Sequence, residues 1–514
     1  MDNVKTTKNK ISTFLNSHQT VISGTFWITF FTLSSKLFGF IKQILIGMFF
    51  GTSKGYDAVV IASGPAGFVS GIIAGAFAAI AIPLYLEEKA KNGDESAKKF
   101  ARGLLGFTSV FLLLFGLLLL IFPDFWIKIF APGFSGQTVQ LAREYLRIFA
   151  ILPLLTGWSS IFSTFLRGER KFFQTALASF FINPVVIVGL LIFAPSMKEG
   201  GYVIALELGT ASTGIFSYFF GMKIWGKFPF GMLSNDKIKR SVYLASPLFI
   251  STAFGTISSL TDKGFASALP AGAVSSLNYS WTIITVIYGL VTSGVLSSSF
   301  TSVSESAVVS DEIALRDKTR AMNEFFIKAL APIMAFLIVA ASWIVSVIYQ
   351  RGAFNAESVQ MTAMAVIGFS TMIITSPITG ALGNIYIAKK KTWRLTSLSL
   401  PFILLNAYMD WVLMGPFKQG GIAASSSIVS FAWMIVLLID LKYKFKISKL
   451  FSAKTILPLI TSVIYVWLFV SPLAGLHSRE KLVLEILIAG VMVLFFTRNE
   501  TRMILKRITR AKRK

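Results

Sequence analysis

A long apolar stretch near the amino terminus constrains the fold more than any other feature. Residues 21–50 read VISGTFWITFFTLSSKLFGFIKQILIGMFF. As an α-helix, these mostly apolar residues are long enough to cross a bilayer with some tilt. Similar runs recur along the chain, which is 54% hydrophobic and only 14% charged, too few polar residues for a soluble protein of 514 residues. The sequence therefore predicts an all-α polytopic membrane protein.

Two lysines lie inside this first apolar stretch, Lys36 near its middle and Lys42 further on. A lysine at the bilayer centre costs at least a few kcal/mol when it faces lipid. The two residues are six positions apart, so they lie about 120° from each other on a helix and can line one broad cavity. We expect both to point into a wet cavity that receives an anionic substrate. The alternative is that they extend to an interface or pair with a buried acid.

Composition excludes several classes of function. The chain has no cysteine, and therefore no disulfide, thiol nucleophile or iron–sulfur site. Its two histidines, His18 and His477, lie in polar segments at opposite ends, which argues against a histidine zinc site, a Ser-His-Asp triad and enzymatic activity. A Walker A motif is absent, so we do not expect ATP hydrolysis to supply energy. No cleavable signal peptide is evident.

The apolar runs and their charged or Gly/Pro breaks predict about fourteen membrane spans. Their approximate positions are 21–50, 57–86, 100–122, 140–166, 172–195, 201–223, 242–268, 273–301, 321–348, 358–387, 394–414, 420–441, 453–471 and 481–497. Alternate loops hold about 36 Lys and Arg residues, against about 9 in the intervening loops. This asymmetry places both termini in the cytoplasm and explains the net charge of +25 without nucleic acid. The basic tail 498–514 is expected to contact anionic lipid.

The chain also contains an internal repeat. IFAPGFSGQTVQLA (Ile129–Ala142) resembles IYQRGAFNAESVQMTA (Ile348–Ala363), and the shared Val-Gln pairs are 220 residues apart. Each repeat would hold six spans, so the two copies keep the same orientation and are related by an axis along the membrane normal. We predict an N-lobe of residues 1–240, a C-lobe of residues 241–447, and a pair of helices with the basic tail in 448–514.

These segments resemble a known family. LFGFIKQILIGMFFGTSKGYDAVVIASGP followed by GAFAAIAIPLYLEE is similar to the opening of the MviN/MurJ family of lipid II flippases, in the multidrug/oligosaccharidyl-lipid/polysaccharide exporter superfamily. Further similar segments are APGF (131–134), RKFFQTALASFFINP (170–184), TDKGFASALPAGAVSSLNYS (261–280) and QRGAFNAESVQMTA (350–363). The resemblance extends over about residues 30–440 and implies fourteen helices in a bacterial plasma membrane.

The resemblance implies a function and a set of binding residues. Family members carry a polyprenyl-diphosphate-linked disaccharide-pentapeptide from the inner to the outer leaflet by alternating access, with cations facing the diphosphate. By alignment, Lys36 and Lys42 match basic residues of the first helix, and Asp57 matches an acidic residue at the start of the second. We expect the partners to be this undecaprenyl-diphosphate-linked glycan and membrane lipids, and the protein to act as a monomer.

The sequence departs from the family where many members have arginines. Val69 and Ser70 align with an arginine pair of the second helix, and Thr282 with an arginine of the eighth. Lysine does not replace the bidentate geometry of arginine, although Lys263 can supply positive charge. These departures leave open a flippase for another polyprenyl-diphosphate glycan, such as an O-antigen or exopolysaccharide unit. A scaffold for envelope assembly that no longer transports is the alternative of a different class.

Several oxygen-bearing side chains are expected at one depth of the membrane. Asn406 and Asp410 are four residues apart and share a helix face, while Asp262 and Ser426 lie at a similar depth in other spans. Carboxylate, amide and hydroxyl oxygens suit a hard cation. Some relatives have a sodium site of this composition, which implies a further backbone carbonyl at Ile422. No cofactor is otherwise required. The alternative is a salt bridge without an ion, such as Asp410 with Lys263.

One further acid is a candidate by its position alone. Glu207 lies inside the sixth predicted span, where an ionisable side chain is a functional candidate by default. It is a possible proton carrier.

Overall fold

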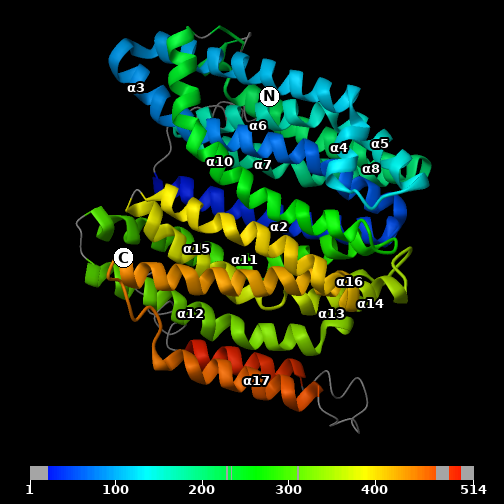
Figure 1. Cartoon of the computed structure of the whole chain (residues 1–514). Coiled ribbons are helices and arrows are strands. Elements are labelled where there is room, and N and C mark those ends of the chain that lie inside the picture. The colour runs from blue at the N-terminus through cyan, green and yellow to red at the C-terminus, as the bar shows by residue number, and fades with distance from the viewer. Residues whose placement is uncertain are drawn as a thin grey trace, which may run out of the picture. The chain divides into compact units, whose positions relative to one another are not determined.

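The computed structural model describes residues 21–226, 230–232, 234–308, 312–389, 391–470 and 485–498, and all regular structure within these ranges is helical (Figure 1). Eight helical stretches in this described part are long and apolar enough to cross a membrane. The prediction of an all-α membrane protein is therefore confirmed, while the count of about fourteen spans stays a prediction. His18, His477 and nearly all of the basic tail lie outside the described residues.

The chain forms two compact units, of which the first ends at Ala271 and the second begins at Gly272. The helices of the first unit are α2 (Val21–Phe50), α3 (Lys54–Ile121), α4 (Pro123–Phe130), α5 (Gly136–Ile148), the 3₁₀ turn η1 (Phe149–Ile151), α6 (Leu152–Gly168), α7 (Phe172–Phe180), α8 (Ile182–Phe220), α9 (Met222–Trp225) and α10 (Asn235–Ala266). Those of the second are α11 (Ala273–Val308), α12 (Glu312–Val339), α13 (Ala341–Tyr349), α14 (Ala356–Phe369), α15 (Met372–Ala388), α16 (Thr392–Lys444), the 3₁₀ turn η2 (Ala453–Thr455), α17 (Ile456–Val470) and a helix at 485–498.

Two of the long helices are hairpins that fold back at a lysine. Lys198 in α8 has φ 50° and Lys418 in α16 has φ 51°, a backbone region that few non-glycine residues adopt. Three residues after each lysine, a glycine permits close approach of the two arms of the hairpin. A Cβ on Gly201 would lie 2.6 Å from the carbonyl carbon of Phe193, and one on Gly421 would lie 2.1 Å from the carbonyl oxygen of Leu413. Each hairpin therefore needs a glycine at this position.

The offset of 220 residues found in the sequence is also present in the backbone. Helix α6 begins at Leu152 and α15 at Met372, and the hairpin lysines, Lys198 and Lys418, are separated by the same interval. The turns after α6 and α15 also match, since the Lys171 amide donates to the Leu166 carbonyl at 2.8 Å and the Lys391 amide to the Tyr386 carbonyl at 2.7 Å. Equivalent residues of the two units therefore occupy equivalent local structure.

Helix α10 lies in the first unit, although the repeat makes it the counterpart of α2. It packs on α3, where the rings of Phe77 and Phe249 meet edge to face at 5.3 Å. Near its carboxyl end, the Gly133 amide of the APGF turn donates to Ser267 Oγ at 3.0 Å. A Cβ on Gly133 would lie 2.4 Å from the Cα of Ala268, so only glycine fits this contact. The predicted lobe boundary after residue 240 stays a prediction.

The second unit has an aromatic core. The rings of Tyr279, Tyr349 and Phe354 lie within 5.0 to 5.3 Å of one another and connect α11 with α13 and the loop that follows it. Helix α17 packs against α12, where Tyr465 and Phe469 are buried beside Ala335. The carboxyl-terminal helices thus contribute to the core of this unit.

Candidate functional site

The two lysines of the first apolar stretch lie on the flanks of the packed face of α2. Gln43 and Ile46 are buried on that face, and Gln43 donates to the Tyr56 hydroxyl of α3 at 3.2 Å. At about 100° per residue, Lys36 and Lys42 fall on opposite sides of this face. Both are half-buried, and in the described part of the chain neither forms an ion pair with a carboxylate. Their charge is therefore available to an anionic ligand.

The other two predicted substrate residues occupy helix ends in the first unit. Asp57 is 3% exposed in the first turn of α3, where the helix dipole stabilises a negative charge. Ser53 caps this helix by accepting from the Tyr56 amide at 3.0 Å. Lys263 is half-buried in the last turn of α10, next to Asp262. The roles of Asp57 and Lys263 in substrate binding stay predictions.

At the three positions where many family members have arginine, this chain has uncharged side chains that either pack in the core or form hydrogen bonds within their own helices. Val69 packs against the apolar core of the first unit. The Ser70 hydroxyl is buried and donates to the Ala66 carbonyl at 2.7 Å, and the Thr282 hydroxyl donates to the Asn278 carbonyl at 2.9 Å. These side chains offer no positive charge to a ligand.

Oxygen-bearing side chains contact a buried carboxylate of the second unit. Asp410 on the first arm of α16 is 0% exposed and accepts from the Asn406 amide at 2.9 Å. The Ser425 hydroxyl also donates to Asp410, and it lies 2.8 Å from the carbonyl oxygen of Ile422. Three of the predicted ion-site residues, Asn406, Asp410 and Ile422, are thus gathered in one hairpin, and their oxygens are of the kind that binds sodium.

Ser425, whose hydroxyl donates to Asp410, is a residue that the sequence reasoning missed. Ser426 is the next residue and is buried at 7% exposure. The hairpin turns at Lys418, so it pairs residue 410 with residue 425 across its arms. The Lys-Gln-Gly-Gly sequence at 418–421 is the signal that would have set this register. Asp262 lies in the other unit, and its participation stays a prediction.

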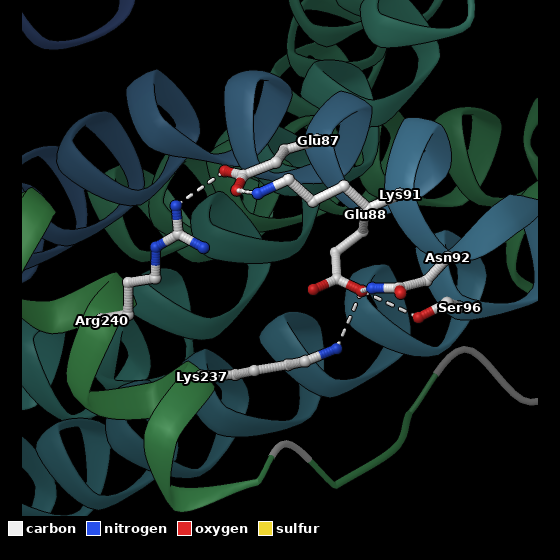
Figure 2. Close-up of polar contacts among 7 residues, drawn as sticks. All are labelled: Glu87, Glu88, Lys91, Asn92, Ser96, Lys237 and Arg240. Atoms are coloured by element: carbon white, nitrogen blue, oxygen red, sulfur yellow. Dashed lines mark hydrogen bonds and ion pairs between the residues drawn. The ribbon is translucent and has the colours of Figure 1, made fainter.

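Charged side chains join the middle of the long helix α3 to the start of α10 (Figure 2). Glu87 pairs with Arg240 at 2.7 Å and with Lys91 at 2.8 Å, and Glu88 pairs with Lys237 at 2.9 Å. Glu88 also accepts from Asn92 and Ser96. We call Glu87, Glu88, Lys237 and Arg240 the charge clamp. It fixes the start of α10 on α3.

The charge clamp predicts a loss of stability in acid. The hydrogen bond from Lys237 outweighs burial and holds the pKa of Glu88 below its usual value of 4.5. A lowered pKa in the folded state stabilises the protein above about pH 4.5, and this contribution disappears as the pH falls through the lowered pKa. We expect Glu88→Gln to lower the melting temperature at neutral pH by about 1–3 °C and to reduce its further fall on acidification. Thermal unfolding measured across pH tests this.

Glu95→Gln is the matched control for the charge clamp. Among the described residues Glu95 pairs only with Lys98 on the same helix, and its side chain is 74% exposed. Such exposed pairs contribute little stability. An equal effect of Glu95→Gln and Glu88→Gln would contradict a role for the clamp in holding α10.

Comparison with known families identifies one matching family model. The model described as lipid II flippase MurJ matches residues 46–491. A probable lipid II flippase MurJ of Buchnera aphidicola subsp. Schizaphis graminum is 27% identical over 410 residues, covering 78% of this chain and 79% of the relative. That of Buchnera aphidicola subsp. Acyrthosiphon pisum is 27% identical over 482 residues, covering 91% and 93%. That of Thermotoga maritima is 24% identical over 436 residues, covering 83% and 87%.

Solved structures share the fold. A structure of lipid II flippase MurJ in an inward closed conformation superposes with a TM-score of 0.79 at 23% identity, covering 93% of this chain and 99% of that one. An inward-facing multidrug resistance MATE family transporter of the MOP superfamily superposes with a TM-score of 0.67 at 13% identity, covering 85% and 96%. The fold is therefore common to transporters whose described substrates differ.

Proposed function

The chain belongs to the lipid II flippase MurJ family, and from this membership we propose that it moves lipid II from the inner to the outer leaflet of a bacterial plasma membrane for peptidoglycan synthesis. The match of the family model over residues 46–491 is the observation that carries the proposal. It is a transporter rather than an enzyme, and a multi-pass membrane protein.

The lysines of α2 supply the chemistry that the substrate requires. The headgroup of lipid II carries a diphosphate, and a half-buried ammonium group without a carboxylate partner is an attractive site for it. Lys36 and Lys42 meet this description in the part of the chain that the structure describes. We assign the diphosphate to these two residues, with Lys263 and Asp57 as further contributors to the same site.

Transport by alternating access follows from the proposed membrane architecture. The proposed architecture comprises fourteen spans in two six-helix lobes, a carboxyl-terminal helix pair and cytoplasmic termini. The repeated local structure of α5 to α8 and α14 to α16 supports two equivalent halves. Two such halves related by an axis along the membrane normal can rock about a substrate between them.

A coupling ion is part of the proposal. Asp410, Asn406 and the Ile422 carbonyl would bind sodium with Ser425, and Ser426 and Asp262 are the other predicted ligands. The oxygen-only donor set fits the ion's preference. An ion that binds one conformation more tightly than another shifts the equilibrium between them.

Genetic complementation tests the proposed function. Depletion of a bacterium's own lipid II flippase stops wall synthesis, and we expect expression of this chain to restore growth and the appearance of lipid II in the outer leaflet. The control is the same host depleted of an O-antigen flippase, in which we expect no rescue. Rescue of the second host alone would contradict lipid II as the substrate and favour another polyprenyl-diphosphate glycan.

A further inference from the structure

Glu207 is a buried acid that the proposed transport site does not use. It lies on the second arm of α8, past the turn at Lys198, and is 7% exposed. Neither carboxyl oxygen has a hydrogen-bond partner, and no described side chain forms an ion pair with it. An ionised carboxylate left in this state costs several kcal/mol, whereas a neutral carboxylic acid costs far less.

The residues around Glu207 place it on the face of α8 that packs against α6. On that face the Ser217 hydroxyl lies 3.2 Å from the Ser163 hydroxyl of α6. One turn earlier, a Cβ on Gly214 would lie 3.9 Å from the Cβ of Ser159. From the first contact to the second the numbering falls along both helices, so the second arm of α8 and α6 are parallel. Glu207, two further turns back, therefore lies at the η1 end of α6, where α8 also contacts η1.

The internal repeat indicates which chemical group this position favours. The counterpart of Glu207 in the second unit, 220 residues on, is Ser427, whose hydroxyl donates to the Gly368 carbonyl at 2.6 Å. The counterpart of Gly368 is Ile148, at the junction of α5 and η1. A hydroxyl donor thus meets a helix-end carbonyl in the second unit. A protonated carboxyl group can act as such a donor, and a carboxylate cannot.

Close approaches of the neighbouring helices support this equivalence. Just after the hairpin turn, a Cβ on Gly200 would lie 3.7 Å from the Tyr145 ring of α5. The equivalent Cβ on Gly420 would lie 3.2 Å from the Met364 carbonyl oxygen of α14. The second arm of α8 therefore crosses α5 as the second arm of α16 crosses α14.

Charged groups on the surrounding elements do not neutralise Glu207. Helix α7 and η1 carry none. The others are Lys36 and Lys42 on α2, Lys54 and Asp57 in the first turn of α3 and the charged residues of its 87–102 segment, Arg143, Glu144 and Arg147 on α5, Arg167 on α6, Lys223 on α9, and Lys198 and Glu199 on α8 itself. Within the described residues none of these forms an ion pair or hydrogen bond with Glu207, and the Glu199 carboxylate instead accepts from Ser53 at 2.8 Å.

We propose that Glu207 is a proton-binding site in the first unit, neutral in this conformation and ionised in another that opens the α6–α8 seam to water. The step is protonation of a carboxylate by a proton from water and its return to water, with no other reactant. It links proton movement to the transport cycle and so rests on the proposed function.

Infrared difference spectroscopy of the purified full-length protein tests the protonation itself. We expect wild type to show the C=O stretch of a protonated carboxyl group at about pH 7, where an ordinary solvent-exposed glutamate is ionised. Glu207→Gln should remove this band, and Glu144→Gln, which changes an exposed carboxylate on α5, should keep it. A spectrum unchanged by Glu207→Gln would overturn the proposal, whatever the protein transports.

Lipid II translocation in proteoliposomes tests the link to transport. Glutamine holds the position permanently neutral, so we expect Glu207→Gln to slow translocation at least about tenfold, to remove its dependence on pH, and to leave lipid II binding intact. Glu207→Asp, which can still exchange a proton, should restore part of the rate. Translocation by Glu207→Gln at the wild-type rate at every pH would overturn the link. A carboxyl band in wild type without lipid II movement would instead count against the proposed function.

Discussion

Replacing Lys36 and Lys42 together by alanine is expected to abolish rescue of a flippase-depleted bacterium and to weaken binding of lipid II to the purified protein about a hundredfold. Each lysine offers a charge-assisted contact to the diphosphate, worth roughly 1.5–3 kcal/mol, and about 1.4 kcal/mol corresponds to a tenfold change in affinity. The two residues flank the packed face of α2 on opposite sides, so each single alanine variant should lose about tenfold. Titration of lipid II against wild type and the three variants measures the effect.

Two controls separate charge from packing in this experiment. Lys128→Ala removes an exposed lysine from α4 and should change neither binding nor rescue. Lys36→Arg combined with Lys42→Arg keeps the positive charge and should retain most of the affinity. Growth supported by the double alanine variant at wild-type level would remove the assigned role of these lysines. Loss of binding in the Lys128→Ala variant would indicate a general electrostatic effect instead.

The membrane-spanning character of the chain could be predicted from the sequence because apolar length is a property of each segment alone. The repeat offset could also be predicted, since Val139 and Val359 belong to similar sequence segments and lie in the first turns of the matching helices α5 and α14. Which residues face each other across a helical hairpin could not be predicted, because this pairing depends on where the chain turns. The turn at Lys418 places Ser425 against Asp410, a contact that a count of depth along separate helices does not predict, while the role of Ser426 stays a prediction.

Continuity of helices and the pairing of surface charges were also beyond the sequence. Residues 87–99 looked like a polar loop between two spans, yet they are largely helical and extend α3, with a break only at Gly93. That extension places Glu87 and Glu88 opposite Arg240 and Lys237, residues about 150 positions away in the chain. Such long-range pairs arise from tertiary packing, so no local sequence pattern predicts them.

Sodium is expected to raise the melting temperature of the purified protein by several degrees, and Asp410→Asn is expected to abolish this increase. A ligand at a hundred times its dissociation constant stabilises the folded state by about 2.7 kcal/mol. Asp410 is the one carboxylate inside the α16 hairpin contact and already lies beside the Asn406 amide and the Ser425 hydroxyl. Removing its charge leaves only neutral oxygens among the ligands that α16 supplies, and these bind a monovalent cation far more weakly. Thermal unfolding in sodium chloride and in choline chloride of equal ionic strength measures the difference.

Asp440→Asn is the matched control because Asp440 is a carboxylate on the same helix with a different partner. It pairs with Arg394 and accepts from the Tyr386 hydroxyl at 2.8 Å. This variant should unfold at a lower temperature in both salts but keep the full sodium increment. Ser425→Ala should reduce the increment, since the Ser425 hydroxyl donates to the carboxylate. If Asp410→Asn retained the sodium-dependent rise in melting temperature, the buried polar cluster in α16 would serve only to hold the two arms of the hairpin together by hydrogen bonds. The coupling ion would then have to bind elsewhere.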